Sequence, residues 1–536
     1  MRKVSKISIT AVAALMAAAS LTSCPKKVSG DLLMWTGFGS SYSIALRDVL
    51  DTYTADTGIV VEHESQGGYA NLQTNMNNSI ATATYPDIAN GYPDHFAGYI
   101  NNEIQVPLDD FIKEYNEEHG VDLLSDYFPE YMKENQELAY DEEGNKITYG
   151  LPFNKSTEVL GYNNYFVQYA QTITPSLGIP TTWDELNTMG PGYRAVMATL
   201  AKSGSTLGKW VYGTIDPNDA NHVLPGSFEI KQAIADQKGT EEGNVPEGKT
   251  LLLDCAKVDM DYFRVCSWDS AENMFITIVR QWGSEYTSFT KADMAIGHGY
   301  ARFYDAAYKD ATKAALQYFE GLYANGTFGL PSDLSSTASY SSDSFLANNC
   351  IFTVCSSGGL SYNIKEGYGR KFRVAPIPYH DATKKFVISQ GTNLAVFDRS
   401  DAATQKKAFE TIVALTTGDL QSEWAVQTGY YPASISATNG TAYQNLIHNA
   451  PKSEVEAAYQ ESAKVNEENY MDATKGWVKF VDPGFMGSSI IRSEVGSIPG
   501  MVFKNWVLRE KGDPSAMSID EILAQSYSRL NTYVKK

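Results

Sequence analysis

The first hundred residues alternate between short apolar runs and segments with helical spacing. Apolar runs over residues 31–36 and 59–64 are each followed by a helix-like segment, the first over residues 42–57 and ended by Gly58. A third apolar run begins at Pro86. Strand–helix–strand–helix–strand in so short a stretch predicts an α/β fold with a doubly wound, mostly parallel sheet.

Sheets of this kind bind ligands beyond the carboxyl ends of their strands, where the connecting loops meet. The loops after the three predicted strands carry Trp35, Ser40, Tyr69 and the segment Tyr92–His95. We therefore expect these aromatic and polar side chains to lie at the edge of a ligand-binding cleft.

The segment Leu151–Asn164 has the pattern of a crossover between two compact units. A polar stretch over Asn154–Thr157 predicts a loop, and the apolar pair Val159 and Leu160 predicts entry into a new strand. A chain of 536 residues is too long for one hydrophobic core, so two or three domains are expected. If two lobes meet here, the polar stretch lies where a ligand would be enclosed.

Later segments continue the alternation of helices and strands. Thr182 is a natural N-cap for a helix, and Glu185 three residues later completes a capping box. Residues 216–248 are rich in Asp, Asn, Gly and Pro and predict an inserted loop. Further helices are expected over residues 271–282, 310–323 and 404–424, and further strands over residues 350–354, 372–378 and 386–397.

The N-terminus predicts an export signal with a lipid anchor. Three basic residues precede an apolar run over residues 7–21, which ends at Leu-Thr-Ser-Cys24. This order resembles a bacterial lipobox, in which cleavage leaves the cysteine as the lipid-bearing first residue; an ordinary signal peptide is the alternative. We expect a signal peptide over residues 1–23, a lipidated Cys24 with a tether over residues 24–30, and a location at the membrane, facing the periplasm or the exterior.

Charge and cysteine content narrow the possible partners and cofactors. The formal net charge of −20 makes the chain a poor partner for nucleic acid. Cys255 and Cys266 could close a disulfide loop, whereas Cys350 and Cys355 lie too far apart along one predicted strand to bond. Neither cysteine nor histidine spacing fits a metal site, so no metal is expected.

Sequence signals for catalysis are also missing. The chain has no GxSxG, HExxH, phosphate-binding P-loop or EF-hand motif, so no cofactor and no catalytic residues are predicted. A pair of carboxylates can be found in any acidic chain, so a secreted glycoside hydrolase stays open as the alternative from another functional class. A surface adhesin is a third possibility.

Four motifs together resemble the extracellular solute-binding proteins of ABC importers, in the maltose-binding-like group. They are LPFNKSTEVLGYNN at 151–164, PTTWDEL at 180–186, FLANNCIFTVCSSG at 345–358 and EWAVQTGYYP at 423–432. The resemblance implies two α/β lobes joined by a hinge around a ligand cleft. It implies a first lobe from residues 31–155 plus 395–432 and a second from residues 156–394 plus 433–536.

The same resemblance implies a function without catalysis. A monomeric, lipid-anchored receptor would close its lobes on a small carbohydrate-type solute and deliver that solute to the permease of an ABC importer. The motifs are most similar to those of glycerol-3-phosphate-binding members, and this implies ligand contacts from Tyr69, Asp94, Ser156, Ser356, Gly391, Tyr430 and Arg492.

The ligand itself stays open between a polyol phosphate and a neutral sugar or oligosaccharide. Arg492 and the small-residue turn Ser356–Gly359 favour a phosphate. The 34 tyrosines favour a sugar, because tyrosine rings stack on sugar rings and bind their hydroxyls. In the glycerol-3-phosphate-binding members, a Glu in the loop after the third strand contacts the glycerol hydroxyls. Asp94 stands one position away from this Glu, so it either replaces the Glu or the contact is lost.

Overall fold

The computed structural model describes residues 30–289, 299–338, 340–365 and 371–534. The predicted signal peptide, the lipidated cysteine at Cys24 and all of the tether except Gly30 lie outside the described residues. Among the described residues, no helix is both long enough and apolar enough to cross a membrane.

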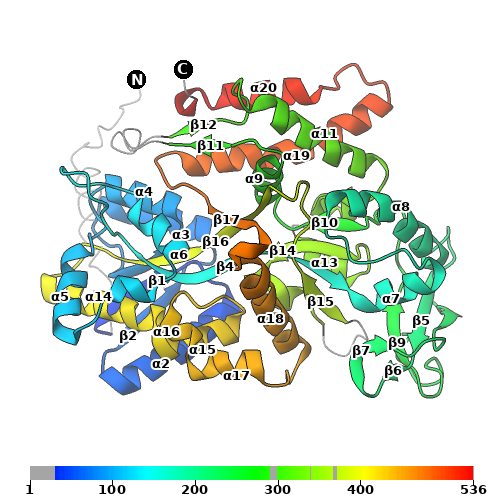
Figure 1. Ribbon diagram of the computed structural model, residues 1–536, viewed down its shortest axis with the longest axis horizontal. Helices are drawn as coiled ribbons and strands as arrows, with labels where there is room; N and C mark the ends of the chain where they lie inside the picture. Colours follow the sequence, from blue (N-terminus) through cyan, green and yellow to red (C-terminus); the bar gives the residue numbers. More distant parts are fainter. Residues whose placement is uncertain (1–29, 290–298, 339, 366–370, 535–536) are drawn as a thin grey trace, which may run out of the picture.

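A ten-stranded sheet runs through the molecule from one end to the other (Figure 1). At one end, β1 (Leu32–Thr36) pairs in parallel with β2 (Val61–Ser65) and with β3 (Ile88–Gly91). The connecting helices are α2 (Ser40–Thr57) and α3 (Tyr69–Ile80). The predicted doubly wound, parallel arrangement of the first hundred residues is therefore confirmed.

The other end of the sheet has the same character. Parallel strands β13 (Phe328–Gly329), β10 (Cys266–Trp268) and β14 (Phe352–Ser356) lie side by side. The antiparallel strand β15 (Phe372–Ala375) also pairs with β4 (Leu151–Asn163), which joins this half of the sheet to the first.

Two long strands cross between the halves of the sheet. β4 pairs antiparallel with β16 (Lys385–Val396) from Leu151 to Thr157, and beyond this point it pairs with β14. β16 pairs with β17 (Trp477–Val481) before the crossing and with β3 after it. The predicted crossover is thus real, and it is made by two adjacent strands.

The prediction of a loop over Asn154–Thr157 was wrong, because these residues lie inside β4 and are buried. Their polar atoms are paired across the sheet. The Thr157 hydroxyl donates to the Ile388 carbonyl at 2.6 Å, and the Asn154 amide oxygen accepts from the Thr392 hydroxyl. Polar residues satisfied by distant partners look like a loop in the sequence.

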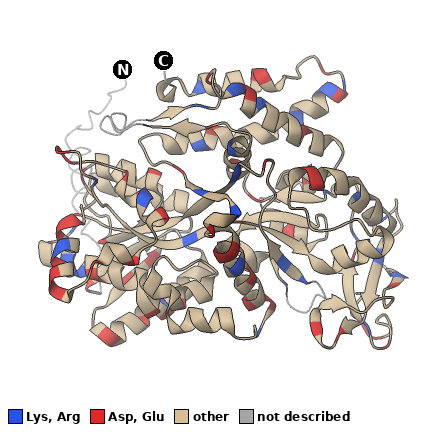
Figure 2. Ribbon diagram, in the orientation of Figure 1, with Lys and Arg blue, Asp and Glu red and all other residues tan. Residues whose placement is uncertain are grey.

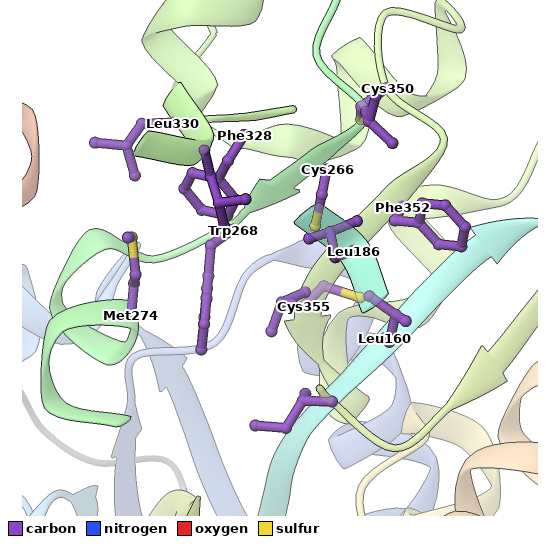
Figure 3. Close-up of a cluster of buried hydrophobic side chains, with 14 of the residues drawn as sticks. Leu160, Leu186, Cys266, Trp268, Met274, Phe328, Leu330, Cys350, Phe352 and Cys355 are labelled. Atoms are coloured by element: carbon purple, nitrogen blue, oxygen red, sulfur yellow. The ribbon is translucent and has the colours of Figure 1, made fainter. Parts of the chain in front are cut away.

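Separate hydrophobic cores lie on the two sides of the crossing strands. One contains Leu46, Phe153 and Trp424, and we call the part of the molecule around it the first lobe. The other contains Leu160 and the residues of Figure 3, and we call its surroundings the second lobe. The residue boundaries predicted for the two lobes stay a prediction.

The cysteines belong to the core of the second lobe. Cys266, Cys350 and Cys355 lie in the buried cluster that also contains Trp268 and Phe352 (Figure 3). None of the four cysteines in the described part of the chain forms a disulfide, so the loop considered between Cys255 and Cys266 is not closed. Burial raises the pKa of the Cys266 thiol, which keeps it protonated and inert.

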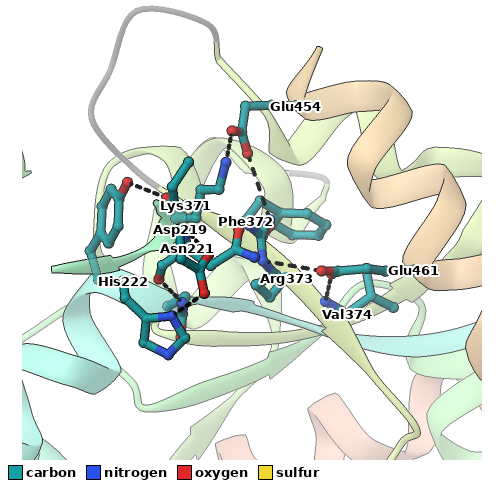
Figure 4. Close-up of polar contacts among 12 residues, drawn as sticks. Asp219, Asn221, His222, Lys371, Phe372, Arg373, Val374, Glu454 and Glu461 are labelled. Carbon is teal, nitrogen blue, oxygen red and sulfur yellow. Dashed lines mark hydrogen bonds and ion pairs between the residues drawn. The ribbon is translucent and has the colours of Figure 1, made fainter. Parts of the chain in front are cut away.

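The insertion predicted as a loop over residues 216–248 contains ordered strands. β6 (Ile215–Asp216) pairs with β7 (Asp219–Val223), and β8 (Glu229–Gln232) pairs with β5 (Lys209–Gly213). Figure 4 shows polar contacts within this hairpin and beside it: Asp219 pairs with His222 at 2.6 Å inside β7, and Arg373 of β15 pairs with Glu461 at 3.1 Å. Short strands with polar exposed faces resemble loop composition, which explains the wrong prediction.

Several helix predictions are confirmed. Thr182 accepts a hydrogen bond from the Glu185 backbone amide at 3.0 Å, and the predicted capping box starts α8 (Trp183–Leu200). The helix predicted over residues 404–424 is two helices, separated at Thr417. The remaining principal helices are α4 (Pro93–Asn101), α5 (Asp109–His119), α6 (Pro129–Gln136), α7 (Asn164–Ile173), α9 (Ala271–Gln281), α11 (Lys309–Ala324), α14 (Ala402–Thr416), α15 (Gly418–Thr428), α17 (Thr441–His448), α18 (Glu454–Val465), α19 (Ser488–Glu510) and α20 (Ile519–Arg529).

Candidate functional site

A cavity of ≈ 260 Å³ lies between the two lobes, next to the crossing strands. The first lobe contributes the loop after β3 and the start of α4, while β16, the end of β17 and the start of α19 form the other walls. The described residues that line it are Tyr92, Pro93, Asp94, His95, Tyr286, Ile388, Ser389, Gln390, Asp482, Pro483, Ser488 and Arg492.

The two lobes touch each other near this cavity. The Tyr42 hydroxyl, on α2 of the first lobe, donates a hydrogen bond to the Gly358 carbonyl of the second. Pro93 packs against Gly484 so closely that a Cβ at Gly484 would lie 2.5 Å from the Pro93 Cβ. The structure therefore shows the lobes closed against each other.

Arg492 is the single lysine or arginine among the described residues that line the cavity, and it is already paired. Its guanidinium donates to the Asp482 carboxylate and to the Asn273 side-chain oxygen. The Tyr286 hydroxyl donates to the other carboxylate oxygen of Asp482 at 2.8 Å. The positive charge of Arg492, which was expected to bind an anionic ligand, is thus compensated by Asp482 within the protein.

The opposite wall carries Asp94 and His95 in the first turn of α4. Pro93 starts this helix, and an acidic residue in the first turn is stabilised by the helix dipole. Burial lowers the pKa of His95, so this imidazole is neutral near pH 7. The lining therefore has two carboxylates, Asp94 and Asp482, against one guanidinium.

Of the predicted contact residues, Asp94 and Arg492 line the cavity, and Tyr69 and Tyr430 lie in an aromatic layer beside it. The Tyr69 ring meets the cavity residue Tyr92 edge-on, with 5.0 Å between ring centroids. Tyr430 stacks parallel to Trp424 and fills the space above Gly358. These tyrosines join the two lobes through side-chain packing.

Ser156, Ser356 and Gly391 lie on the crossing strands and at the end of β14. Ser156 is buried in β4 opposite Gln390, and the Ser356 hydroxyl accepts from the Gly358 backbone amide at 3.2 Å. The expected anion-binding turn after Ser356 leads into a short 3-10 helix, η2 (Ser357–Asn363). Gly391 has a φ of +110°, and a Cβ there would lie 1.7 Å from the Asn154 carbonyl oxygen, so its role is to let the two crossing strands approach.

The family model described as "Bacterial extracellular solute-binding protein" matches residues 48–451 of this chain. The chain belongs to this family. As a member of an extracellular family the solute-binding protein is exported. A search of curated proteins finds no match.

Solved structures share its fold. UgpB from Mycobacterium tuberculosis, in complex with glycerophosphocholine, is 16% identical with a TM-score of 0.60, over 94% of this chain and 98% of its own. The GacH receptor of Streptomyces glaucescens is 13% identical with a TM-score of 0.61, over 95% and 100%. The sugar-binding protein MalE from Xanthomonas citri is 13% identical with a TM-score of 0.59, over 94% and 96%. The expected two-lobed periplasmic-binding-protein fold is confirmed.

A second hollow adjoins the cavity of the solute-binding protein. It has a volume of ≈ 620 Å³ and shares Ser389, Asp482 and Pro483 with the first. Its other walls are α6 and β17, which include Lys133 and Lys479 among several carboxylates. Figure 2 shows the mixture of charges on the elements around the crossing strands.

Several residues of this site were not predicted from the sequence. Asp482 and Tyr286 were not recognised because their significance depends on Arg492, which is distant in sequence from Tyr286. Glu158 was also missed, although it stands two positions after Ser156 in the same strand, which was an available signal. Burial raises the pKa of Glu158 to about 7, against opposing contributions from the Trp268 and Asn273 side chains and from the charge of Arg492.

The described residues hold no group of histidine, cysteine and carboxylate side chains that could bind a metal ion. The cavity chemistry consists of hydroxyl, amide, carboxylate and guanidinium groups around an apolar floor. Such groups are suited to binding and orienting a small polar solute.

Proposed function

We propose that this protein is the solute receptor of an ABC importer and that it captures a small, neutral, hydroxylated solute of the carbohydrate type. The observation that carries the proposal is the cavity of ≈ 260 Å³ between the lobes, to which both lobes contribute hydrogen-bonding side chains. A solute that contacts both lobes favours the closed arrangement over the open one.

Size and charge support the choice of solute. Small-ligand pockets commonly have volumes of about 300–1,000 Å³, so this cavity suits a compact ligand such as one sugar unit. Two carboxylates and one paired guanidinium line it, and this charge balance disfavours an anion. Tyrosine hydroxyls and carboxylates are suitable partners for sugar hydroxyls.

The mechanism would be hinge closure around β4 and β16. Both strands cross between the lobes side by side, so bending at the crossing moves one lobe against the other. The contacts between Tyr42 and Gly358 would then form on closure. The closed receptor would deliver its solute to the permease subunits in the membrane, and no chemical step is required.

We further propose that the mature receptor is a monomer anchored by a lipid on Cys24. Its lobes would divide at the predicted boundaries, residues 31–155 plus 395–432 and residues 156–394 plus 433–536. The family membership supports an exported location, and the lipobox-like sequence supports the anchor.

Two other solutes are supported by specific observations. An oligosaccharide is supported by the adjoining hollow of ≈ 620 Å³, which would hold further sugar units. The GacH structure was solved with acarbose and the UgpB structure with glycerophosphocholine, so folds of this kind accept both sugar-like and phosphate-containing ligands. A polyol phosphate is supported by Arg492 but requires displacement of Asp482.

A thermal-shift screen of the purified protein tests the proposal. D-glucose, D-galactose, maltose and glycerol-3-phosphate are added separately, and chromatography measures whether each stays intact. We expect a neutral sugar to raise the melting temperature and to be recovered unchanged. Hydrolysis of maltose would support a glycoside hydrolase instead, and stabilisation by glycerol-3-phosphate alone would support the polyol phosphate.

A further inference from the structure

We propose that Glu158 is a ligand-binding residue of the cleft, whose Oε2 atom accepts a hydrogen bond from a hydroxyl group of the solute. This residue would select neutral hydroxylated solutes against phosphorylated ones. The inference rests on the proposed function and names the group that sets its specificity.

The strand register places Glu158 on the same face of the sheet as Gln390, one of the residues that line the cavity. Gln390 lines the cavity and lies directly opposite Ser156 in the antiparallel pair of β16 and β4. Residues directly opposite each other in an antiparallel pair share a face, as do residues two apart in one strand. Ser156 and Glu158 therefore share the face of Gln390.

Ser356 lies on the same face of the sheet, because it is directly opposite Glu158 in the antiparallel pair of β14 and β4. Two of the residues that the family resemblance implies as contacts, Ser156 and Ser356, thus flank Glu158 on one face. Arg492 approaches from α19, since its charge acts on the Glu158 carboxyl.

The Glu158 carboxyl is only half satisfied. Its side chain is 1% exposed, and its Oε1 atom accepts a hydrogen bond from the Trp268 indole at 2.7 Å. The Oε2 atom is buried and accepts no hydrogen bond from the described residues. A buried acceptor without a donor is costly, so a donor from outside the protein is the natural partner.

Two of the neighbouring donors, Arg492 and Ser341, are already engaged, and the Asn273 side chain lies close enough to lower the pKa of the carboxyl. Arg492 donates to Asp482 and Asn273, and the Ser341 hydroxyl and backbone amide both donate to Asp269 beside the site. A solute hydroxyl supplies the missing donor, whereas a phosphate oxygen supplies another acceptor and adds negative charge. The geometry therefore favours hydroxyl groups at this position.

Titration calorimetry with D-glucose, maltose and glycerol-3-phosphate tests the inference on the wild type and on Glu158→Gln, which keeps the shape but replaces an acceptor by a donor. We expect at least a tenfold loss of affinity for the neutral sugar that binds the wild type. Glu461→Gln is the matched control, because Glu461 is a partly buried carboxylate of the second lobe that pairs with Arg373 outside the cavity lining (Figure 4). This control should bind like the wild type.

The pH dependence gives a second readout with a definite sign. The charged or titratable groups that face Glu158 are Arg492 from α19, Asp269 before α9, Cys355 from β14 and Tyr470 from η3 (Asn466–Tyr470). A hydroxyl donor binds the ionised carboxylate, so sugar affinity should rise by up to about tenfold from pH 6 to pH 8. In Glu158→Gln this rise should vanish, and for a phosphate bound to the protonated carboxyl the sign would be reversed.

The outcomes separate the two proposals. A wild type that binds a sugar while Glu158→Gln binds it within twofold overturns the role of Glu158 and leaves the proposed function intact. A wild type that binds only glycerol-3-phosphate, or none of the three probes, overturns the proposed solute class and this inference with it. If Glu158→Gln does not fold, Glu158→Asp replaces it: the shorter side chain retracts the acceptor and should also lose sugar affinity, and unchanged affinity would overturn the inference.

Discussion

Two charged residues of β4, Lys155 and Glu158, are both fully buried, yet their surroundings differ. The Lys155 ammonium donates to the Glu134 carboxylate and to the Asn393 side-chain oxygen, the latter at 2.7 Å. The Glu158 carboxyl accepts one hydrogen bond, from the Trp268 indole, and its other oxygen has no hydrogen-bond partner among the described residues. The Asn273 side chain lies close enough to lower the pKa of this carboxyl. Residues three apart in a strand face opposite sides of the sheet.

This difference separates a structural charge from a functional one. The Lys155 side of β4 contacts α6 through Glu134, and its charges are paired inside the protein. The Glu158 side shares its face with Ser156 and Ser356, and one oxygen of its carboxyl has no hydrogen-bond partner among the described residues. Buried polar groups are nearly always satisfied, so an exception at a cleft indicates a place for a ligand.

The largest expected effect is a loss of stability when the buried ion pair of Lys155 and Glu134 is broken. Burial, with a smaller contribution from the charge of Lys479, lowers the pKa of Lys155. The Glu134 carboxylate is the acidic partner of its ammonium group. Lys155→Met leaves the Glu134 carboxylate without its lysine donor, whereas the Asn393 side-chain oxygen keeps the hydrogen bond from the Asn135 amide at 2.8 Å. Loss of one partner of a buried ion pair costs about 3–5 kcal/mol, so the free energy of unfolding in urea should fall by that amount.

The double variant Lys155→Met/Glu134→Gln is the control. It removes the unpaired carboxylate, so it should recover part of the lost stability. If Lys155→Met unfolds at the same urea concentration as the wild type, the buried ion pair of Lys155 and Glu134 does not stabilise the fold. A double variant less stable than the single one would show that Glu134 has another partner.

A smaller effect is expected from the titration of Glu158. Its pKa of about 7 in the folded protein lies above the ordinary value of 4.5, so the folded state binds its proton more tightly than the unfolded state. Stability is therefore lost as the pH rises from about 4.5 to 7 and is constant above that range. Between pH 5 and pH 8 the wild type should lose about 2–3 kcal/mol relative to Glu158→Gln.

Urea unfolding of both proteins at pH 5, 6, 7 and 8 measures this difference, since all other titrating groups are common to the pair. Equal pH profiles would mean that Glu158 keeps its ordinary pKa and has a donor in solution. A profile of the opposite sign would mean that the carboxylate, and not the acid, is the form stabilised by folding.

The order of helices and strands could be predicted from the sequence better than the candidate ligand-binding site. Elements with local signals were recognised, such as the capping box at Thr182 and Glu185 and the alternating strands and helices of the first hundred residues. The strand over Asn154–Thr157 was not, because its polar side chains are satisfied by β16, more than two hundred residues away. A local pattern carries no record of such partners.

The site shows the same limit. Arg492 was expected at the cleft and lines it, but its pairing with Asn273 joins residues 219 positions apart. Glu158 could have been placed on the face of Ser156 by counting along the strand. The sequence does not show that one oxygen of the Glu158 carboxyl lacks a hydrogen-bond donor, because this depends on how β14, α9 and α19 pack around it.

The smallest expected effect comes from making the cleft more like an anion site. Asp482 accepts hydrogen bonds from Arg492 and from Tyr286, so it compensates the one guanidinium of the lining. Asp482→Asn keeps the shape and removes this charge. Glycerol-3-phosphate affinity, measured by calorimetry at pH 7, should rise about tenfold, which corresponds to about 1.4 kcal/mol.

Asp305→Asn is the matched control, because Asp305 also joins an arginine and a tyrosine, Arg302 and Tyr527, but lies outside the cavity lining. It should leave the affinity for every probe unchanged. A tenfold gain in Asp482→Asn alone would show that the wild-type cleft excludes anions by pairing Arg492, in agreement with an unpaired acceptor at Glu158. A loss of glycerol-3-phosphate binding in Asp482→Asn would instead mean that Asp482 orients Arg492 for a phosphate, and the two sides of β4 would then differ for a reason other than solute charge.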